Sequence, residues 1–172
     1  MRFKKRLSCF AFLTLVCSAE VFAAITVPMY LTQSNGSSQS IGTITLMEYK
    51  HCGVIVKPNL HDLTPGTHGF HIHENPSCDE KGMAAGGHFD PTTTKMHNGP
   101  YEDQSHLGDM PILVVDSNGK ASLPVLAPRM ELARLKGHAI MIHAGGDNYK
   151  DQPEKLGGGG ARIACGVIPA NE

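Results

Sequence analysis

Alternating apolar and polar residues run through much of this chain and predict short β-strands. The alternation is regular over residues 24–31 and 41–49, as in strands that bury one face, and residues 33–38 between them predict a turn. Further strands are predicted over the following ranges: 54–57, where Pro58 should end the strand, then 66–73, 112–115, 121–126, 138–143 and 162–168. Residues 116–119 contain Asn-Gly, which predicts a hairpin between the strands on either side, and residues 130–136 predict a short helical turn.

Two long segments, residues 74–109 and 144–161, show no regular alternation and predict loops. Loops of this length are uncommon in a compact domain unless they serve a function. The second long loop contains four consecutive glycines, Gly157–Gly160, close to Arg162, which indicates a backbone that approaches a site closely. About eight short strands and two long functional loops predict an all-β fold, a Greek-key antiparallel β-sandwich or barrel.

Composition agrees with a single globular domain over residues 24–172. The chain has 172 residues, of which 41% are hydrophobic and 18% are charged. Its formal net charge is -1 and it has no long basic run, which argues against both a nucleic-acid partner and a polybasic membrane patch. The one unusual count is ten histidines.

The first 23 residues have the pattern of a secretory signal peptide. Four basic residues in positions 2–6 precede an apolar run over residues 7–17, and Val21-Phe22-Ala23 supplies a cleavage pattern. The apolar run is shorter than the ~20 residues that span a bilayer, so no membrane anchor is predicted. We therefore expect an exported protein that begins at Ala24 and carries a net charge of -4.

Three cysteines remain after residue 23, in a compartment that permits disulfides. Cys78 lies in the first long loop, Cys165 in the last predicted strand, and Cys52 in a short connector. One bridge and one free thiol are the natural count for three cysteines. We expect the bridge to join Cys78 to Cys165.

One group of residues in the first long loop has the composition of a zinc site. His88, His97, His106 and Asp109 supply three imidazoles and one carboxylate, a four-ligand set suited to tetrahedral zinc. A bound metal would also explain how so irregular a loop is ordered. Any one of these residues taken alone is more simply a surface residue.

A second group of histidines lies on predicted strands. His71 and His73 alternate along one strand and so project on the same side, and His143 ends another strand. Nitrogen ligands of this kind favour copper, which needs a fourth nitrogen. His88 is the candidate to bridge the two metals through both of its ring nitrogens.

Several motifs together resemble the copper/zinc superoxide dismutases, and the match extends over nearly all of residues 24–172. They are Gly69-Phe70-His71-Ile72-His73, Gly86-Gly87-His88-Phe89-Asp90-Pro91, His97, Gly99-Pro100, His106-Leu107-Gly108-Asp109, Ile142-His143 and the run from Gly159 to Ile168. The step from His88 to His97 and the segment 147–153 are similar to the periplasmic bacterial branch. Cys52 is an additional thiol, and no histidine-rich extension follows the signal peptide.

The resemblance implies an antioxidant oxidoreductase that disproportionates superoxide to dioxygen and hydrogen peroxide. It implies a copper ion on His71, His73, His88 and His143, and a zinc ion on His88, His97, His106 and Asp109. It also implies that Asp147 accepts hydrogen bonds from ligand histidines of both metals, such as His71 and His97.

The catalytic residues on this interpretation are His88, which would hold a proton, and Arg162, which would bind the superoxide anion. A copper carrier or buffer on the same fold is the alternative, although it would have no use for Arg162. The implied location is the periplasm, and a homodimer is left open. His51, His61, His68 and His138 are expected to be structural or surface residues.

Overall fold

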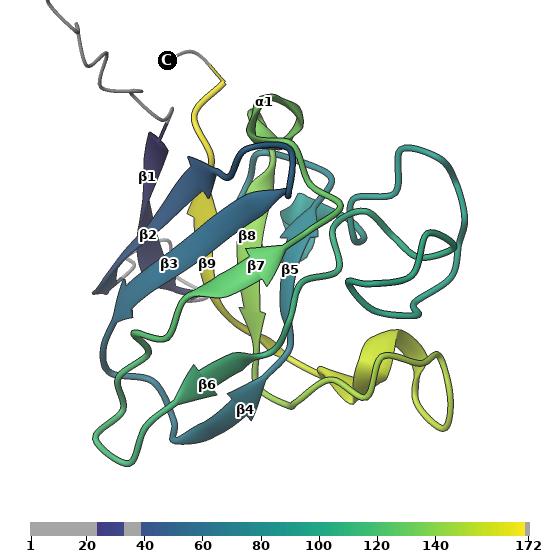
Figure 1. Cartoon of the computed structure of the whole chain (residues 1–172). Helices are drawn as coiled ribbons and strands as arrows, with labels where there is room; N and C mark the ends of the chain where they lie inside the picture. Colours follow the sequence, from purple (N-terminus) through teal and green to yellow (C-terminus); the bar gives the residue numbers. More distant parts are fainter. Residues whose placement is uncertain (1–23, 33–38, 171–172) are drawn as a thin grey trace, which may run out of the picture.

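The computed structural model describes residues 24–32 and 39–170 (Figure 1). The predicted signal peptide, residues 1–23, and the predicted turn at 33–38 lie outside the described residues. Among the described residues no helix is both long and apolar enough to cross a bilayer.

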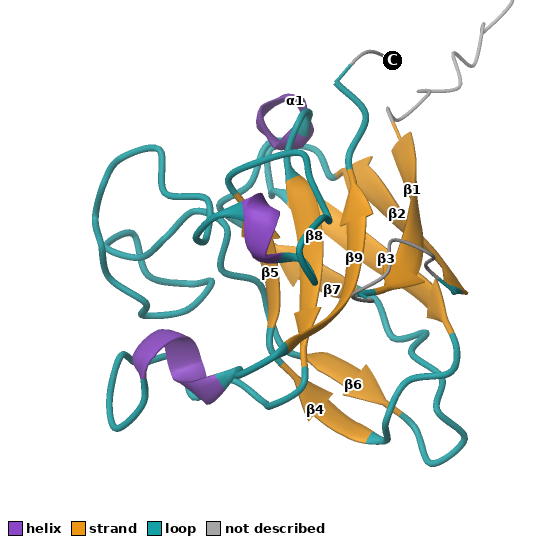
Figure 2. Ribbon diagram, turned by 180° about the vertical axis from the view of Figure 1, so that it is seen from behind, coloured by secondary structure: helices purple, strands orange, loops and turns teal. Residues whose placement is uncertain are grey.

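Most of the described chain forms one curled antiparallel sheet, a half-barrel, as the sequence predicted (Figures 1 and 2). Its seven strands, in spatial order, are β5 (Phe70–His73), β8 (Ala139–His143), β9 (Arg162–Val167), β1 (Ala24–Leu31), β2 (Ser40–Glu48), β3 (Val54–Leu60) and β7 (Val125–Ala127). A separate two-stranded sheet pairs β4 (Gly66–His68) with β6 (Leu113–Val115). A single helical turn, α1 (Leu132–Leu135), falls within the range predicted for it.

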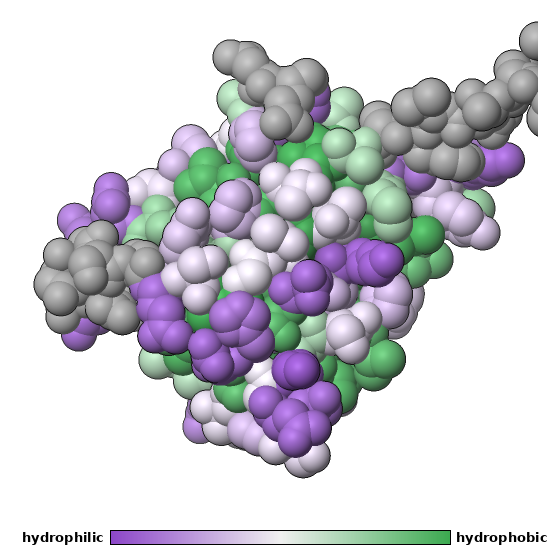
Figure 3. Space-filling model, turned by 90° about the vertical axis from the view of Figure 1, so that its left-hand side faces the viewer, coloured by the Kyte–Doolittle hydropathy of each residue, from purple (hydrophilic) through white to green (hydrophobic). Residues whose placement is uncertain are grey.

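The core lies inside the curled sheet. Alternate residues of β1 are buried, including Val27 and Met29, while the residues between them face solvent. Each fully buried aliphatic side chain contributes about 1.5–3 kcal/mol relative to its exposed state. On the side of the molecule formed by β1 and β2, hydrophilic and hydrophobic residues are interspersed (Figure 3).

Strands β5 and β8 differ from β1 because both of their faces are buried. Phe70 and Ile72 pack into the main core, so His71 and His73 project from the opposite face of β5. That opposite face is covered by the first long loop, which contains the 3-10 turn η1 (Met83–Ala85). A small second cluster there contains Ala85 and Met141 next to the disulfide between Cys78 and Cys165.

The predicted strand over residues 66–73 is wrong in one respect, because Gly69 divides it into β4 and β5. These two strands belong to different sheets. Gly69 donates its N–H to Gly145 and accepts from the N–H of His143, so the chain changes sheets here. A Cβ atom at Gly69 would lie 3.3 Å from the carbonyl oxygen of Gly146, which shows how closely the second long loop approaches.

The predicted hairpin around residues 116–119 is also wrong. A local turn does form, since Gly119 donates to the carbonyl of Asp116, but the flanking strands do not pair with each other. Strand β6 pairs with β4, and β7 pairs with β3. Ala121 bridges to Leu60 and so directs the chain toward the larger sheet.

Strand β3 continues to Leu60, whereas the sequence predicted an end at Pro58. Pro58 lies opposite Ile44 of β2. On its other side, β3 pairs with β7 only at Val54–Val56. Within the described part of the chain, Pro58 therefore has no strand partner on the side that faces away from β2. Proline is tolerated at such edge positions because no partner there needs its missing N–H.

Both long loops leave the same side of the half-barrel, next to β5 and β8 (Figures 1 and 2). The second contains the turn η2 (Lys155–Gly158). The backbone N–H of His97, in the first loop, donates to the carboxylate of Asp151, in the second. Residues far apart in the sequence are thereby brought together over β5 and β8.

Candidate metal centre

Four histidines converge where β5, β8 and the first long loop meet. His71 and His73 come from β5, His143 from the end of β8, and His88 from the loop, where it forms an isolated bridge with His73. All four are buried, and one ring nitrogen from each lies within 4.8 Å of the others. These are the four residues on which the family resemblance implied a copper ion.

The outer ring nitrogen of each strand histidine is held by a hydrogen bond. His71 Nε2 donates to Asp147 at 2.8 Å, and His73 Nδ1 donates to the carbonyl of Gly86 at 3.0 Å. His143 Nδ1 lies 3.3 Å from the carbonyl of Gly160. Hydrogen bonds of this kind fix the tautomer and aim the other nitrogen, with its lone pair, at a shared point.

Six buried histidine nitrogens have no hydrogen-bond partner among the described residues. They are His71 Nδ1, His73 Nε2, His88 Nε2, His97 Nδ1, His106 Nδ1 and His143 Nε2. A buried polar atom without a partner costs free energy, so natural proteins leave few of them. Six together, all aimed inward, fit a site that binds metal ions through nitrogen.

The predicted zinc ligands form a second group around one oxygen atom. Asp109 Oδ1 lies 2.9 Å from His88 Nδ1, 3.0 Å from His97 Nδ1 and 3.4 Å from His106 Nδ1. All four residues are buried. Three Nδ1 atoms and one carboxylate oxygen are a donor set suited to tetrahedral zinc.

His88 belongs to both groups. Its Nδ1 faces Asp109, and its Nε2 has no hydrogen-bond partner and lies among the donors of the strand histidines. His71 also lies near the second group, with a donor atom within 4.8 Å of those of His88, His97 and Asp109. Its Nε2 is already bound to Asp147, however, so we assign His71 to the first group alone.

Burial keeps the strand histidines neutral. It lowers the pKa of His71 to about 3, that of His73 to about 2 and that of His143 to about 4, and the nearby His88 adds to each shift. A neutral imidazole has a free lone pair at pH 7, which a metal ligand needs. These three side chains are therefore ready to bind a cation.

The carboxylates have the opposite effect on His97. Burial alone would lower its pKa, but the contacts with the carboxylates of Asp109 and Asp147 outweigh burial and raise that pKa to about 9. Burial would raise the pKa of Asp109, yet its contacts with His106, His88 and His97 hold that pKa well below its usual range. The buried anions thus favour a positive charge in this group.

Asp147 connects the two groups. Its Oδ2 accepts from His71 at 2.8 Å and its Oδ1 accepts from His97 Nε2 at 2.8 Å. The glycine run packs against the same residues: a Cβ atom at Gly157 would overlap Asp147, and one at Gly159 would lie 3.1 Å from the ring of His143. The close backbone approach predicted for the glycine run is therefore found.

Comparison with known proteins gives the family. Residues 40–168 match the family model described as copper/zinc superoxide dismutase (SODC). The chain belongs to the copper/zinc superoxide dismutase family. The resemblance inferred from the sequence is confirmed, and with it an oxidoreductase that uses copper and zinc and acts on superoxide.

Individual relatives support the same conclusion. The superoxide dismutase of Photobacterium leiognathi is 58% identical over 140 residues, which cover 77% of this chain and 80% of that protein. The solved enzyme from Brucella abortus is 48% identical with a TM-score of 0.80, covering 85% of this chain and 99% of that one. The monomeric enzyme from Salmonella enterica is 51% identical with a TM-score of 0.74, at the same coverage. Nothing in these comparisons favours a copper carrier.

In this dismutase, Arg162 lies at the start of β9 and is half-buried. Its two terminal nitrogens donate to the carbonyls of Gly82 and Gly86, in the part of the first long loop that follows Cys78. Burial lowers the pKa of its guanidinium from the usual value, although arginine remains charged at neutral pH. A fixed cation therefore lies next to the loop that carries His88.

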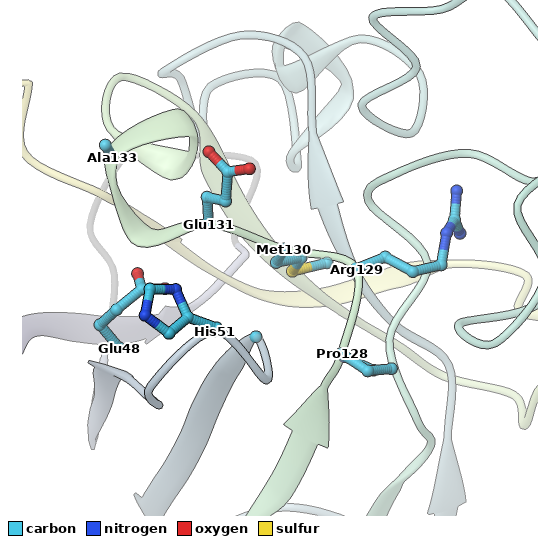
Figure 4. Close-up of a pocket in the computed structure, with 8 residues that line it drawn as sticks. Glu48, His51, Pro128, Arg129, Met130, Glu131 and Ala133 are labelled. Atoms are coloured by element: carbon cyan, nitrogen blue, oxygen red, sulfur yellow. The ribbon is translucent and has the colours of Figure 1, made fainter.

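A cavity of about 470 Å³ opens beside two of the candidate zinc ligands. Its lining includes His88 and His106 from the first long loop and Lys155 from the second. A separate cavity of about 440 Å³, near α1, contains none of the candidate ligands and is lined by these residues: Glu48, His51, Gly53, Pro128, Arg129, Met130, Glu131 and Ala133 (Figure 4). Of these two cavities, the first is thus the one that is lined by candidate metal ligands.

Two buried residues near the site were not among the predicted site residues, although His68 was expected to be a structural or surface residue. His68 is buried, and its ring nitrogens lie 2.7 Å from the carbonyl of His143 and 2.8 Å from that of Thr64, so it braces the end of β8. Ser105 is fully buried beside the zinc group. Its place immediately before His106 is the only sequence signal that could have indicated it.

Proposed function

We propose that copper in this enzyme is bound by four histidines: His71, His73, His88 and His143. Zinc is bound by His88 together with three further ligands: His97, His106 and Asp109. The observation that carries this proposal is the set of six buried histidine nitrogens without hydrogen-bond partners. Four of these nitrogens belong to the copper group: His71 Nδ1, His73 Nε2, His143 Nε2 and His88 Nε2. The bond from His71 Nε2 to Asp147 orients the first of them. The other two lie beside the Oδ1 atom of Asp109.

When bound, copper supplies one-electron chemistry, so that two superoxide anions and two protons become one dioxygen and one hydrogen peroxide. The guanidinium of Arg162 binds and orients the small anion, because its planar donors are held in place by two carbonyls. The lone pair on His88 Nε2 that would hold copper could in turn hold a proton when it is not bound to the metal, while Nδ1 stays beside Asp109. That proton is delivered to the peroxide product.

The experiment is metal analysis of matched ligand variants. Native protein should contain one copper and one zinc per chain. His143→Ala should lose copper and keep zinc, whereas His106→Ala should lose zinc and keep copper binding. Zinc retained at full occupancy by His106→Ala, or copper retained by His143→Ala, would show that the ligand sets are assigned wrongly.

We further propose that residues 1–23 direct export and that the mature enzyme works in the periplasm. The relatives are bacterial enzymes, and the disulfide between Cys78 and Cys165 suits an oxidising compartment. The related enzyme from Salmonella enterica is described as monomeric. Sedimentation of the mature chain distinguishes a monomer from the homodimer that the sequence leaves open.

A further inference from the structure

The two carboxylate oxygens of Asp109 have different environments. Oδ1 faces the three Nδ1 atoms of the zinc group, as described above. Oδ2 faces away from them and receives the hydroxyl of Ser105 at 2.6 Å. Ser105 is fully buried and Asp109 is 2% exposed, so water does not compete for this contact.

The hydroxyl of Ser105 has little freedom to point elsewhere. Its oxygen accepts from the backbone N–H of Asn98 at 2.7 Å, which leaves the single hydroxyl hydrogen to be donated. The two acceptors within reach are Asp109 Oδ2 at 2.6 Å and the carbonyl of Met96 at 3.4 Å. That carbonyl already accepts from the N–H of His106 at 2.9 Å. The shorter bond to an anion is also the stronger one, so the hydrogen lies toward Asp109.

The backbone on both sides of this contact is fixed from another part of the fold. Arg129, which follows β7, donates to the carbonyl of Ser105 at 2.8 Å and to that of His106 at 3.2 Å. Its side chain extends away from Glu48 and Glu131 toward the first long loop (Figure 4). Ser105 is therefore a preorganised donor, held by its own hydrogen bonds and by Arg129.

We propose that Ser105 is a positioning residue for the zinc site. Its hydroxyl holds Oδ2 of Asp109 so that Oδ1 alone is presented to the metal, and it keeps the carboxylate from rotating. This inference rests on the proposed zinc ligand set. Outer hydrogen-bond partners of metal ligands commonly contribute a factor of about 10–100 in metal affinity.

The test compares three variants of the mature protein loaded with zinc. Ser105→Ala removes the donor to Asp109. Asn98→Ala is the matched control, since it removes the side-chain bond to the carbonyl of Gln104 in the same loop but keeps the backbone N–H that donates to Ser105. Asp109→Ala removes the proposed ligand itself. Zinc transfer to excess chelator is timed for each, and Co²⁺ bound in place of zinc reports the geometry through its visible absorption spectrum.

We expect Ser105→Ala to release zinc about 10–100 times faster than native protein and to change the Co²⁺ spectrum, with Asn98→Ala unchanged in both. Equal release from Ser105→Ala and Asn98→Ala, with fast release from Asp109→Ala, would overturn this inference and leave the ligand set intact. Native release from Asp109→Ala would overturn the ligand set as well. If Ser105→Ala does not fold, Ser105→Gly removes the same hydroxyl donor and should shift both readouts in the same direction.

Discussion

Arg162 and His73 donate to the same carbonyl oxygen, that of Gly86, at 2.6 Å and 3.0 Å. One atom of the first long loop therefore holds both the guanidinium proposed to bind the substrate anion and a ring of the proposed copper ligands. Gly86 is held in turn by its own N–H, which donates to the carbonyl of Met83. A change in this short turn should disturb substrate binding and metal binding together.

Reversing the charge at Arg162 should separate metal binding from catalysis. Arg162→Glu should keep both metals but lower the second-order rate about 10- to 1000-fold, because electrostatic steering contributes that much in charged clefts. Arg162→Lys should lose less, since it keeps the charge without the planar fork. Stopped-flow measurement of superoxide decay, with copper content checked in each sample, gives the rates.

Salt provides the control for this prediction. Added salt should slow the native enzyme, because exposed charges are screened over a Debye length of ~10 Å at 0.1 M. The rate of the Arg162→Glu variant should fall less, or should rise, over the same series of salt concentrations. Equal rates for native and Arg162→Glu proteins at low salt would remove Arg162 from the mechanism.

Removing the carboxylate of Asp147 should weaken both metal sites at once. Asp147→Ala frees His71 Nε2 and His97 Nε2, so each ring loses the bond that orients it. We expect the affinity for each metal to fall by about 10–100-fold, as is usual when such partners are lost. Competition with chelators for copper and for zinc measures the two constants, and an effect confined to one metal would contradict the prediction.

The disulfide should contribute measurably to stability. It joins Cys78 to Cys165, which are 87 positions apart in the sequence, and loss of such a bridge commonly costs ~2–4 kcal/mol. Cys52 is exposed and free, so Cys52→Ser is a suitable control and should change the free energy of unfolding by less than about 0.5 kcal/mol. Denaturant unfolding in an oxidising buffer compares Cys78→Ser with this control, and equal midpoints would contradict the prediction.

Export should yield a protein that begins at Ala24. The apolar run and the Val21-Phe22-Ala23 pattern motivate this expectation. Intact-mass measurement of protein recovered from the periplasm is the check. A mass that includes residues 1–23 would show that the segment is retained.

The strands were predictable wherever local pattern and tertiary pairing agreed. The range of β1 matches the prediction fully because its alternation is regular and one face meets the core. The hairpin prediction at residues 116–119 was wrong because the Asn-Gly sequence indicates only a turn. The pairing of the flanking strands depends on residues far away in the sequence, such as Leu60, which bridges to Ala121. The break at Gly69 likewise depends on Gly145, far along the chain, and no local pattern indicates it.

The candidate ligands could be predicted because histidine and aspartate carry their chemistry in the residue type. Two-residue spacing on a strand then places His71 and His73 on one face. Ser105 and the carbonyl of Gly86 could not be predicted in this way. Serine and backbone carbonyls occur throughout the chain, and only the folded loop shows which of them face Asp109, His73 or Arg162.

The glycine run raises the entropy cost of ordering the second long loop. Glycine loses more backbone freedom on ordering than any other residue, and fixing a backbone costs about 1–2 kcal/mol per residue. Gly157 and Gly159 are ordered against Asp147 and the ring of His143, the very side chains that metal loading would immobilise. Loading and loop ordering should therefore be one coupled transition. Amide hydrogens such as that of Gly157, which bonds to the carbonyl of Lys150, should exchange with deuterium more slowly once both metals are bound.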